Sequence, residues 1–306
     1  MSREPVILVG VDGSDASYQA LDWAVAEAKK LSWRLHIVCV YSLPSFSATS
    51  IDGGYAILDD SQIVAGAQSV VADAVQRAGT QVEVSSAVEA GDPTTVMAEL
   101  SKDAGLIVIG KHRGSGVADR LLGAVSSSLP PLAHCPTVVV PFMGADAPVK
   151  SPVKKIVVGV DNSDSARCAL KHAIREAELW DAQLTAFSAI ALVQGAGAMA
   201  WVPTPIDHDE LLTSVREGLS QTVDEVLGDK PLKVECRVLD GSAAALLTEF
   251  STAVDLIVVG TRGRGGFTGL LLGSTSQTVM ARSSCPVMVV PSRVDKDLPS
   301  SYPWEK

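Results

Sequence analysis

The sequence predicts an α/β protein made of two tandem, doubly wound domains, each a five-stranded parallel sheet sandwiched by helices. The first observation is that short runs rich in Val and Ile alternate with stretches of helical spacing along the chain. This alternation is typical of parallel strands covered on both faces. The second observation is an internal repeat, in which Val9 to Ser14 recurs as Val158 to Ser163 with one substitution. Right-handed crossovers between parallel strands then give the doubly wound arrangement.

The repeat covers most of the chain. Three further blocks recur at nearly the same offset, which makes coincidence negligible. We therefore expect a first copy over residues 1–143 and a second copy over 153–293. The segment from Met143 to Pro152 is rich in Pro, Gly and Ala and should join them. The three blocks begin with Leu106, Leu121 and Cys135 in the first copy, and their second-copy equivalents lie at Leu256, around Leu272, and at Cys285.

The first half of each copy predicts two strands and two helices. In the first copy, residues 5–11 form a continuous apolar run, which indicates a buried strand. Residues 16–31 repeat Ala and Leu at helical spacing and should form a helix. A second strand is expected over 34–41. After an irregular stretch, a second helix is expected over 59–77.

The second half of the copy completes the sheet. We predict a strand over 82–88, a helix over 94–102, a strand over 106–110, a helix that ends near residue 133, and a strand over 137–140. The second copy follows the same order and ends in a strand over 287–290. The fifth strands are apolar and should lie at a sheet edge, where exposed backbone groups favour pairing.

Composition limits the possible functions. The chain has 306 residues, 47% of them hydrophobic, and a mean hydropathy of +0.25, as expected for a folded protein with a large core. A net charge of −10 argues against nucleic acid as the main ligand. No run approaches the ~20 apolar residues of a membrane span, and a strand-like run follows the N-terminus directly, so we expect a cytoplasmic protein. Five well-separated cysteines should be buried, reduced thiols.

The candidate site lies where strands end. In parallel sheets, ligands bind beyond the carboxyl ends of the strands. Asp12 and Asp161 follow the first strand of each copy, and a glycine-rich loop follows the fourth strand, starting at Gly110 and Gly260. These features should therefore meet at one rim, although the two aspartates could instead simply cap the helices that follow them.

The loop of the second copy is the stronger candidate for binding phosphate. It holds five glycines between Gly260 and Gly269, and Gly273 and Ser274 follow where a helix begins. Glycines allow close approach to the backbone, and a helix N-terminus favours an anion. Arg262 and Arg264 add fixed positive charge. The alternative is an ordinary surface loop in which glycines serve turns.

With these residues in place, the chain resembles the universal stress protein family in its tandem, two-domain form, over about 5–142 and 153–292. The family's phosphate-binding motif is G-x-x-G, nine residues, then G-S or G-T. The second copy matches it in full as Gly260, Gly263, Gly273 and Ser274. The resemblance implies that ATP is bound, with or without Mg²⁺. It also implies that the early aspartate (Asp12, Asp161) holds the adenosine end and that Val40 and Ala189 contact adenine.

The first copy departs from this motif. Arg113 stands where the second copy has Gly263, and Ala124 replaces Ser274, although Gly110 and Gly123 keep the spacing. A side chain at 113 would be strained if the backbone needs a positive φ there, and Gly114 could absorb this by shifting the turn by one residue. Lys111 and Arg113 could supply compensating charge. We expect the second copy to bind ATP more tightly than the first.

These features predict an ATP-binding regulatory protein with little or no hydrolysis. No lysine follows the glycine loop as in a Walker A sequence, and no two-carboxylate metal site is visible, so no catalytic or metal-binding residue is assigned. The resemblance implies that the fifth strands pair the two copies within one chain, with a homodimer and an unidentified regulatory partner as further expectations. Two alternatives stay open: an enzyme of the related adenine nucleotide α-hydrolase fold that cleaves ATP between its α- and β-phosphates, and a nucleotide-free dimerising scaffold.

Overall fold

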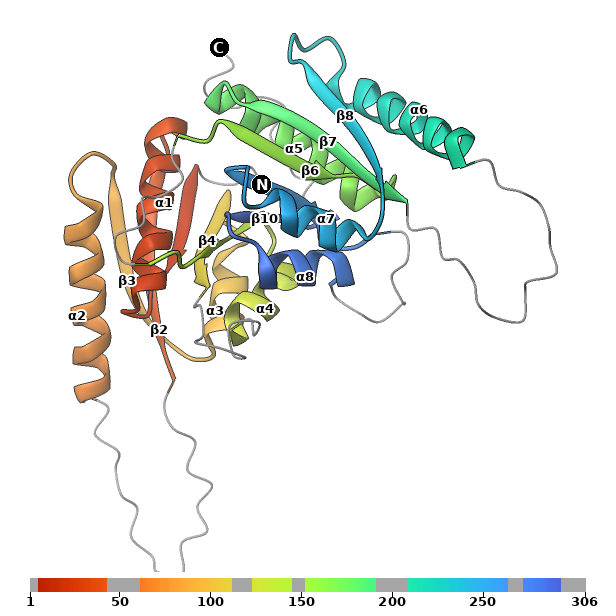
Figure 1. The fold of residues 1–306 in the computed structure, drawn as a ribbon. Coiled ribbons are helices and arrows are strands. Elements are labelled where there is room, and N and C mark those ends of the chain that lie inside the picture. The colour runs from red at the N-terminus through yellow and green to blue at the C-terminus, as the bar shows by residue number, and fades with distance from the viewer. Residues whose placement is uncertain are drawn as a thin grey trace, which may run out of the picture.

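The two copies form one continuous ten-stranded sheet, as Figure 1 shows. The computed structural model describes residues 5–42, 61–111, 123–144, 152–190, 208–263 and 272–292. The strand order is β3-β2-β1-β4-β5-β10-β9-β6-β7-β8, so each copy contributes five neighbouring strands. All pairs within a copy are parallel, and only the central pair, β5 with β10, is antiparallel. The predicted fold class is confirmed.

The elements of the first copy lie within two residues of their predicted ends. They are β1 (Val6–Gly10), α1 (Asp15–Leu31), β2 (Arg34–Tyr41), α2 (Ser61–Ala78), β3 (Val84–Ala90), α3 (Pro93–Leu100), β4 (Leu106–Lys111), α4 (Ala124–Leu132) and β5 (Thr137–Pro141).

The second copy repeats this order. Its elements are β6 (Lys155–Gly159), α5 (Asp164–Trp180), β7 (Gln183–Ile190), α6 (His208–Leu227), β8 (Val234–Asp240), α7 (Ala243–Phe250), β9 (Leu256–Gly260), α8 (Ser274–Arg282) and β10 (Val287–Val290).

The sheet separates two hydrophobic cores, each of which runs through both copies. Strand residues alternate between the faces, as the pleat of a strand requires. In β1, Ile7 and Val9 belong to the core that includes residues of α1, α2, α5 and α6, whereas Leu8 belongs to the core that includes residues of α3, α4, α7 and α8. The central side chains of β1, β4, β6 and β9 are buried on both faces, which explains why the middle of each strand is an apolar run.

The two copies meet first through backbone pairing. Val139 lies opposite Val287, and Val138 lies opposite Met288, in the antiparallel β5–β10 pair. All four side chains are at most 1% exposed. The expectation that the fifth strands join the copies within one chain is therefore confirmed.

The copies meet again where α1 packs against α5. Glu27 and Glu176 occupy equivalent positions in the two helices, and their buried carboxyl groups lie close enough to influence each other's protonation. The indole Nε1 of Trp180 donates to Glu27 Oε2 at 3.0 Å. Burial raises the pKa of Glu27 to about 7. Burial and the neighbouring Glu27 charge raise the pKa of Glu176 well above its usual range, so the pair retains a proton at neutral pH.

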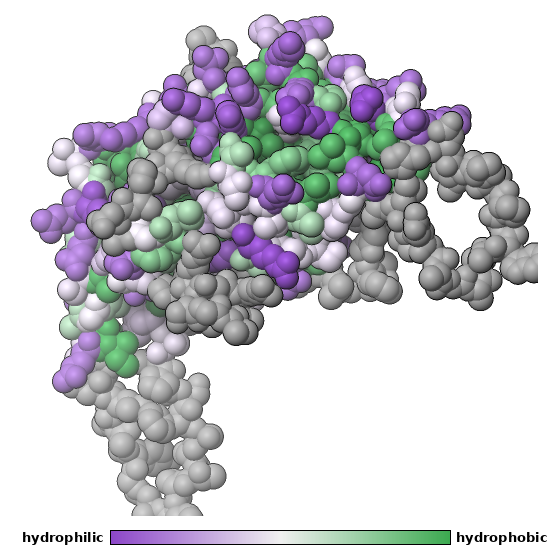
Figure 2. Space-filling model, viewed as in Figure 1, coloured by the Kyte–Doolittle hydropathy of each residue, from purple (hydrophilic) through white to green (hydrophobic). Residues whose placement is uncertain are grey.

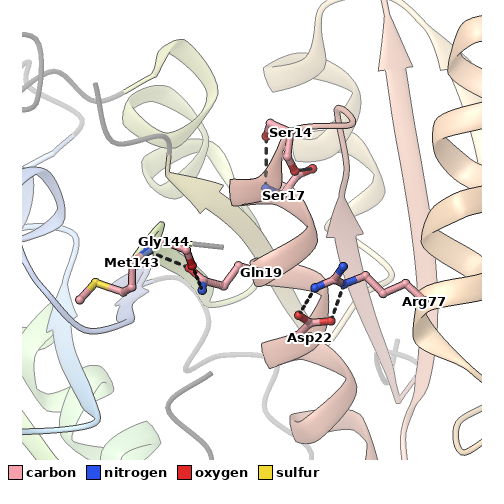
Figure 3. A network of polar contacts seen from close by, with 7 residues as sticks. All are labelled: Ser14, Ser17, Gln19, Asp22, Arg77, Met143 and Gly144. Carbon is pink, nitrogen blue, oxygen red and sulfur yellow. Dashed lines mark hydrogen bonds and ion pairs between the residues drawn. The ribbon is translucent and has the colours of Figure 1, made fainter. Parts of the chain in front are cut away.

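Polar contacts of α1 fix the end of the first copy (Figure 3). Gln19 accepts a hydrogen bond from Met143 N at 2.9 Å and donates to Gly144 O at 3.4 Å, which holds the chain just after β5. Asp22 receives two hydrogen bonds from Arg77 of α2, at 2.8 and 2.7 Å. The Gln19 bonds anchor the start of the segment between the copies, and the Asp22–Arg77 pair joins α1 to α2.

Two expectations from composition can be compared with the structure. Among the described residues, no helix is both long and apolar enough to cross a membrane. Cys39, Cys135, Cys168 and Cys285 are buried free thiols, as predicted, whereas Cys236 is half-buried.

Candidate functional site

Each copy has a cavity at the carboxyl ends of its strands. The cavity of the second copy has a volume of about 500 Å³ and that of the first about 490 Å³, within the range of small-molecule sites. The predicted residues of each copy converge on its cavity. Those of the second copy are Asp161, Ala189, Gly260, Arg262, Gly263, Gly273 and Ser274. Those of the first copy are Asp12, Val40, Gly110 and Gly123.

The aspartate after the first strand is held by a tight turn. Asp161 Oδ1 accepts hydrogen bonds from Ser163 N at 3.2 Å and from Ser163 Oγ at 2.6 Å. Asn162, between them, has a φ of 61°, a left-handed conformation that Asn tolerates. Asp12 has the same turn, with Gly13 at a φ of 81° and bonds from Ser14.

The following serine caps the helix, and the aspartate does not. Ser163 accepts from Ala166 N at the start of α5, and Ser14 accepts from Ser17 N at the start of α1. The capping alternative for the aspartates is therefore wrong. Burial alone would raise the pKa of Asp12, but the bonds from Ser14 and Ser17 outweigh it and lower that pKa, so Asp12 is ionised at neutral pH.

The glycine that ends the fourth strand has a packing role. A Cβ on Gly260 would lie 2.7 Å from Ser165 O in the first turn of α5. A Cβ on Gly110 would lie 2.8 Å from Ser17 N in the first turn of α1. These glycines therefore let the first helix of each copy approach the rim, in addition to lining the cavity.

Gly263 packs directly against the neighbouring aspartate. A Cβ at this position would overlap Asp161 Oδ2. The sequence-based explanation, a positive φ, is wrong, because Gly263 is not among the residues with positive φ. Gly263 and Asp161 thus lie side by side in the lining of the second cavity, and a side chain at 263 would displace the carboxylate or the backbone.

The helix after the glycine loop starts without a side-chain cap. Gly273 is the N-cap of α8, and no side chain accepts from the first-turn N–H groups. The hydroxyl of Ser274, the first residue of α8, makes no hydrogen bond to another described residue and lines the cavity. Uncapped N–H groups and the positive end of the helix dipole favour an anion. The N-cap of α4, Gly123, is also uncapped, but Ala124 follows it.

Two serine hydroxyls hold the start of the second glycine loop in place. Ser165 Oγ accepts from Arg262 N at 3.3 Å. From α8, Ser276 Oγ donates to Gly260 O at 2.6 Å. The sequence analysis did not identify Ser165 and Ser276. The position of Ser276, two residues after Ser274 of the motif, could have indicated that it lies beside the loop.

The inner wall of the second cavity is apolar. Phe187, Ala189 and Leu247 line it, and the Phe187 ring packs edge-on against Phe250 with centroids 5.1 Å apart. Figure 2 shows hydrophobic surface in the region of β6 and β7, surrounded by hydrophilic residues. A flat ring system therefore suits this end of the cavity, and an anion suits the end at α8. Phe187 and Leu247 were not predicted.

Lys111 does not lie where the sequence suggested. Its side chain is 4% exposed, and its Nζ donates to Met280 O at 2.9 Å and to Ala281 O, both in α8 of the other copy. The expectation that it could compensate for missing phosphate contacts in the first cavity is wrong. Arg113 and the predicted site residues Gly114 and Arg264 lie outside the described residues.

Metal binding has no candidate in the described part of the chain, which contains no group of three or more His, Cys, Asp or Glu side chains placed to hold an ion. The cavity of the second copy has one carboxylate among its described lining residues, that of Asp161.

Comparison with known proteins gives a consistent result. Residues 5–141 and 152–291 each match the sequence profile of the universal stress protein family. Universal stress protein Rv1996 of Mycobacterium tuberculosis is 30% identical over 95% of this chain and 96% of its own length. Universal stress protein Rv2623 of the same species is 31% identical over 92% and 95%. The crystal structure of a universal stress protein from Archaeoglobus fulgidus is similar in fold, with a TM-score of 0.68 and 23% identity over 94% of this chain and 99% of that one.

Proposed function

This chain belongs to the universal stress protein family, and we propose that it is an ATP-binding regulatory protein whose second copy holds the principal site. The observation that carries the proposal is the second cavity. It brings Asp161, Gly263 and the uncapped start of α8 at Ser274 around one space of about 500 Å³. The apolar wall at Phe187 and Ala189 suits adenine, and the α8 N-terminus suits phosphates.

The residues fit a bound nucleotide in three ways. Gly263 has no space for a side chain beside Asp161, so the loop backbone lines the cavity directly. The Ser274 hydroxyl and the first N–H groups of α8 are available as donors. Exposed Arg262 adds a fixed positive charge suited to phosphate. Where Mg²⁺ accompanies ATP, it would be bound mainly by the phosphates.

Binding without rapid turnover follows from the same residues. Hydrolysis needs a group that accepts a proton from the attacking water. Among the described residues lining the second cavity, Asp161 has the one carboxylate. Its Oδ1 already accepts two hydrogen bonds, from the backbone N–H and the hydroxyl of Ser163. We infer that ATP is held rather than hydrolysed and that the output is a conformation or a partner contact that depends on the bound nucleotide. Turnover in the ordinary enzyme range of ~1–10³ s⁻¹ would contradict this inference.

The scaffold alternative is favoured by one observation. The copies share a ten-stranded sheet and two continuous cores, so the first copy has a clear structural role even without a ligand. We propose that the first copy mainly supports the second. A cytoplasmic location, a homodimer and a regulatory protein partner remain further proposals that rest on the family.

The proposal is tested by denaturing the purified chain and identifying any released nucleotide, followed by titration of the nucleotide-free protein with ATP. We expect ATP or ADP in the released fraction and saturable binding. Release of AMP and pyrophosphate during incubation would favour the α/β-phosphate-cleaving enzyme. Absence of released nucleotide together with absence of binding would leave the scaffold.

A further inference from the structure

The first copy contributes a charged group to a helix of the second. Lys111, the last residue of β4, is nearly fully buried, and its ammonium group donates to two carbonyls in the last turn of α8, Met280 O at 2.9 Å and Ala281 O. The last carbonyls of a helix have no partner within the helix and carry the negative end of its dipole. They therefore compensate the desolvation of a buried lysine.

The other end of the same helix forms the phosphate end of the second cavity. α8 is nine residues long, about 13 Å at 1.5 Å per residue. Its N-cap Gly273 and its first residue Ser274 line the cavity, and Ser276 fastens it to Gly260 O. A short helix moves as one unit, so a contact at its C-terminus also sets the position of its N-terminus.

The second copy does not offer an equivalent lysine to the helix α4 of the first copy. Thr261 occupies the position in the second copy that Lys111 occupies in the first, and it follows Gly260 as Lys111 follows Gly110. In α4, Pro130 and Pro131 stand where α8 has Met280 and Ala281. The asymmetry matches the difference between the two motifs, because the helix that receives the lysine is the one that starts with Gly-Ser.

We propose that Lys111 is a positioning residue for the second nucleotide site. By bonding the C-terminal carbonyls of α8, it fixes the axial position of that helix and neutralises its negative end, which favours a polyanion at its N-terminus. This inference rests on the proposed function. It gives the first copy, whose own phosphate motif is altered, a role in binding at the second site.

The test compares ATP and adenosine binding in the full chain by calorimetric titration. Lys111→Met should weaken ATP binding about three- to thirtyfold, the range expected for loss of a charge at a helix end. Adenosine affinity should change less than about twofold, because adenosine has no phosphate to reach α8. Lys111→Arg should recover most of the ATP affinity. Lys102→Met, which removes an exposed lysine of the first copy, controls for the change in net charge.

Each outcome is decisive. If wild-type protein does not bind ATP, the proposed function fails and this inference fails with it. If wild type binds ATP and Lys111→Met binds it equally well, or loses ATP and adenosine equally, the positioning role is wrong while the proposed function stands. Lys111→Gln, which keeps hydrogen-bond donors but not the charge, is measured where Lys111→Met does not fold. Loss of the fold in both variants would assign Lys111 to stability and overturn the inference.

Discussion

In the second copy, Ser165 and Ser276 bond to the backbone at the start of the glycine loop. In the first copy, Ala16 replaces Ser165, and Ser126, the equivalent of Ser276, donates instead to Gly123 O at 3.1 Å. The cavities nevertheless have almost the same volume. A cavity at a sheet rim therefore survives duplication because the fold creates it, whereas phosphate binding depends on a few small residues that one copy can lose.

The aspartates after the first strand of each copy also show which parts of the site the copies share. Asp12 and Asp161 keep the same turn and the same bonds to the following serine. Their environments differ at Gly263, which packs against Asp161, and at Ser17, whose hydroxyl accepts from Asp12 N at 3.3 Å and whose equivalent in the second copy is Ala166. The aspartate turn is therefore common to both copies, whereas the glycine-loop motif and the apolar wall, with Phe187 and Ala189 in place of Val38 and Val40, distinguish them. Three substitutions test this distinction, and a fourth tests a contact that the copies share.

The largest effect is expected for Gly263→Arg, which copies Arg113 of the first copy. The new side chain would overlap the Asp161 carboxylate and displace the loop. We expect ATP affinity to fall by at least about a hundredfold, equivalent to ~2.7 kcal/mol, in equilibrium binding. Gly114→Arg introduces the same side chain into the loop of the first copy, one position beyond the equivalent of Gly263, and should leave the tight site intact. Loss of binding in Gly114→Arg alone would reverse the assignment of the two copies.

Ser274→Ala, which copies Ala124, should have the next largest effect. It removes a hydroxyl that can donate to a charged phosphate, worth about 1.5–3 kcal/mol. ATP affinity should fall accordingly, while adenosine affinity stays within about twofold of wild type. Ser127→Ala, on α4 of the first copy, is the matched control. Equal losses for ATP and adenosine would show that Ser274 does not contact the phosphates.

Ser165→Ala, which copies Ala16, should have a smaller effect. It removes the acceptor for Arg262 N, an ordinary hydrogen bond worth about 0.5–1.5 kcal/mol. We expect ATP affinity to decrease about two- to tenfold. Ser17→Ala, in the first copy, should not change it. An unchanged ATP affinity in Ser165→Ala would show that the hydrogen bond from Arg262 N to Ser165 Oγ does not contribute to ATP binding.

The smallest effect on ATP binding is expected for a change at Glu27 and Glu176, the glutamates that both copies share. The same change should have a clear effect on stability. The pKa of Glu27 in the folded chain, about 7, lies above its unfolded value, and that of Glu176 is raised further. The stability that this pair contributes is complete below the unfolded pKa and is lost as pH rises through the folded values. The melting temperature should therefore fall between pH 6 and pH 9.

Glu27→Gln should flatten this part of the profile, because the amide supplies a permanent donor to Glu176. His172 and Arg175 also lie beside Glu176, along the small cavity at the α1–α5 contact. A His172→Gln variant therefore controls for histidine titration. The difference between the wild-type and Glu27→Gln profiles should be a few degrees, at roughly 2–4 °C per kcal/mol for a chain of this size. Parallel profiles would show that the pair does not titrate in this range.

Most of the fold could be predicted from the sequence. The repeat fixed the number of copies, and apolar runs such as Leu106 to Gly110 marked the buried strands, because both faces of a parallel sheet are covered. The convergence of Asp161 and Ser274 on one cavity followed from topology alone. Nucleotide binding by these residues remains a prediction.

The remaining features depend on contacts between distant segments, which periodicity does not encode. The sequence placed Lys111 in a loop beside the first cavity, but its Nζ reaches a helix 169 residues away. The need for Gly263 comes from Asp161, in a different loop, and not from its own backbone conformation. The pairing of Glu27 with Glu176 depends on how α1 meets α5 across the junction, which the repeat alone does not specify.

The most direct measurement is the number of ATP molecules bound per chain, determined by equilibrium dialysis of wild type and Gly263→Arg at an ATP concentration that saturates only the tight site. We predict about one ATP per chain in wild type, as one intact motif implies, and none in Gly263→Arg. No bound ATP in wild type, or the same number in both proteins, would contradict the assignment of the nucleotide site to the second copy.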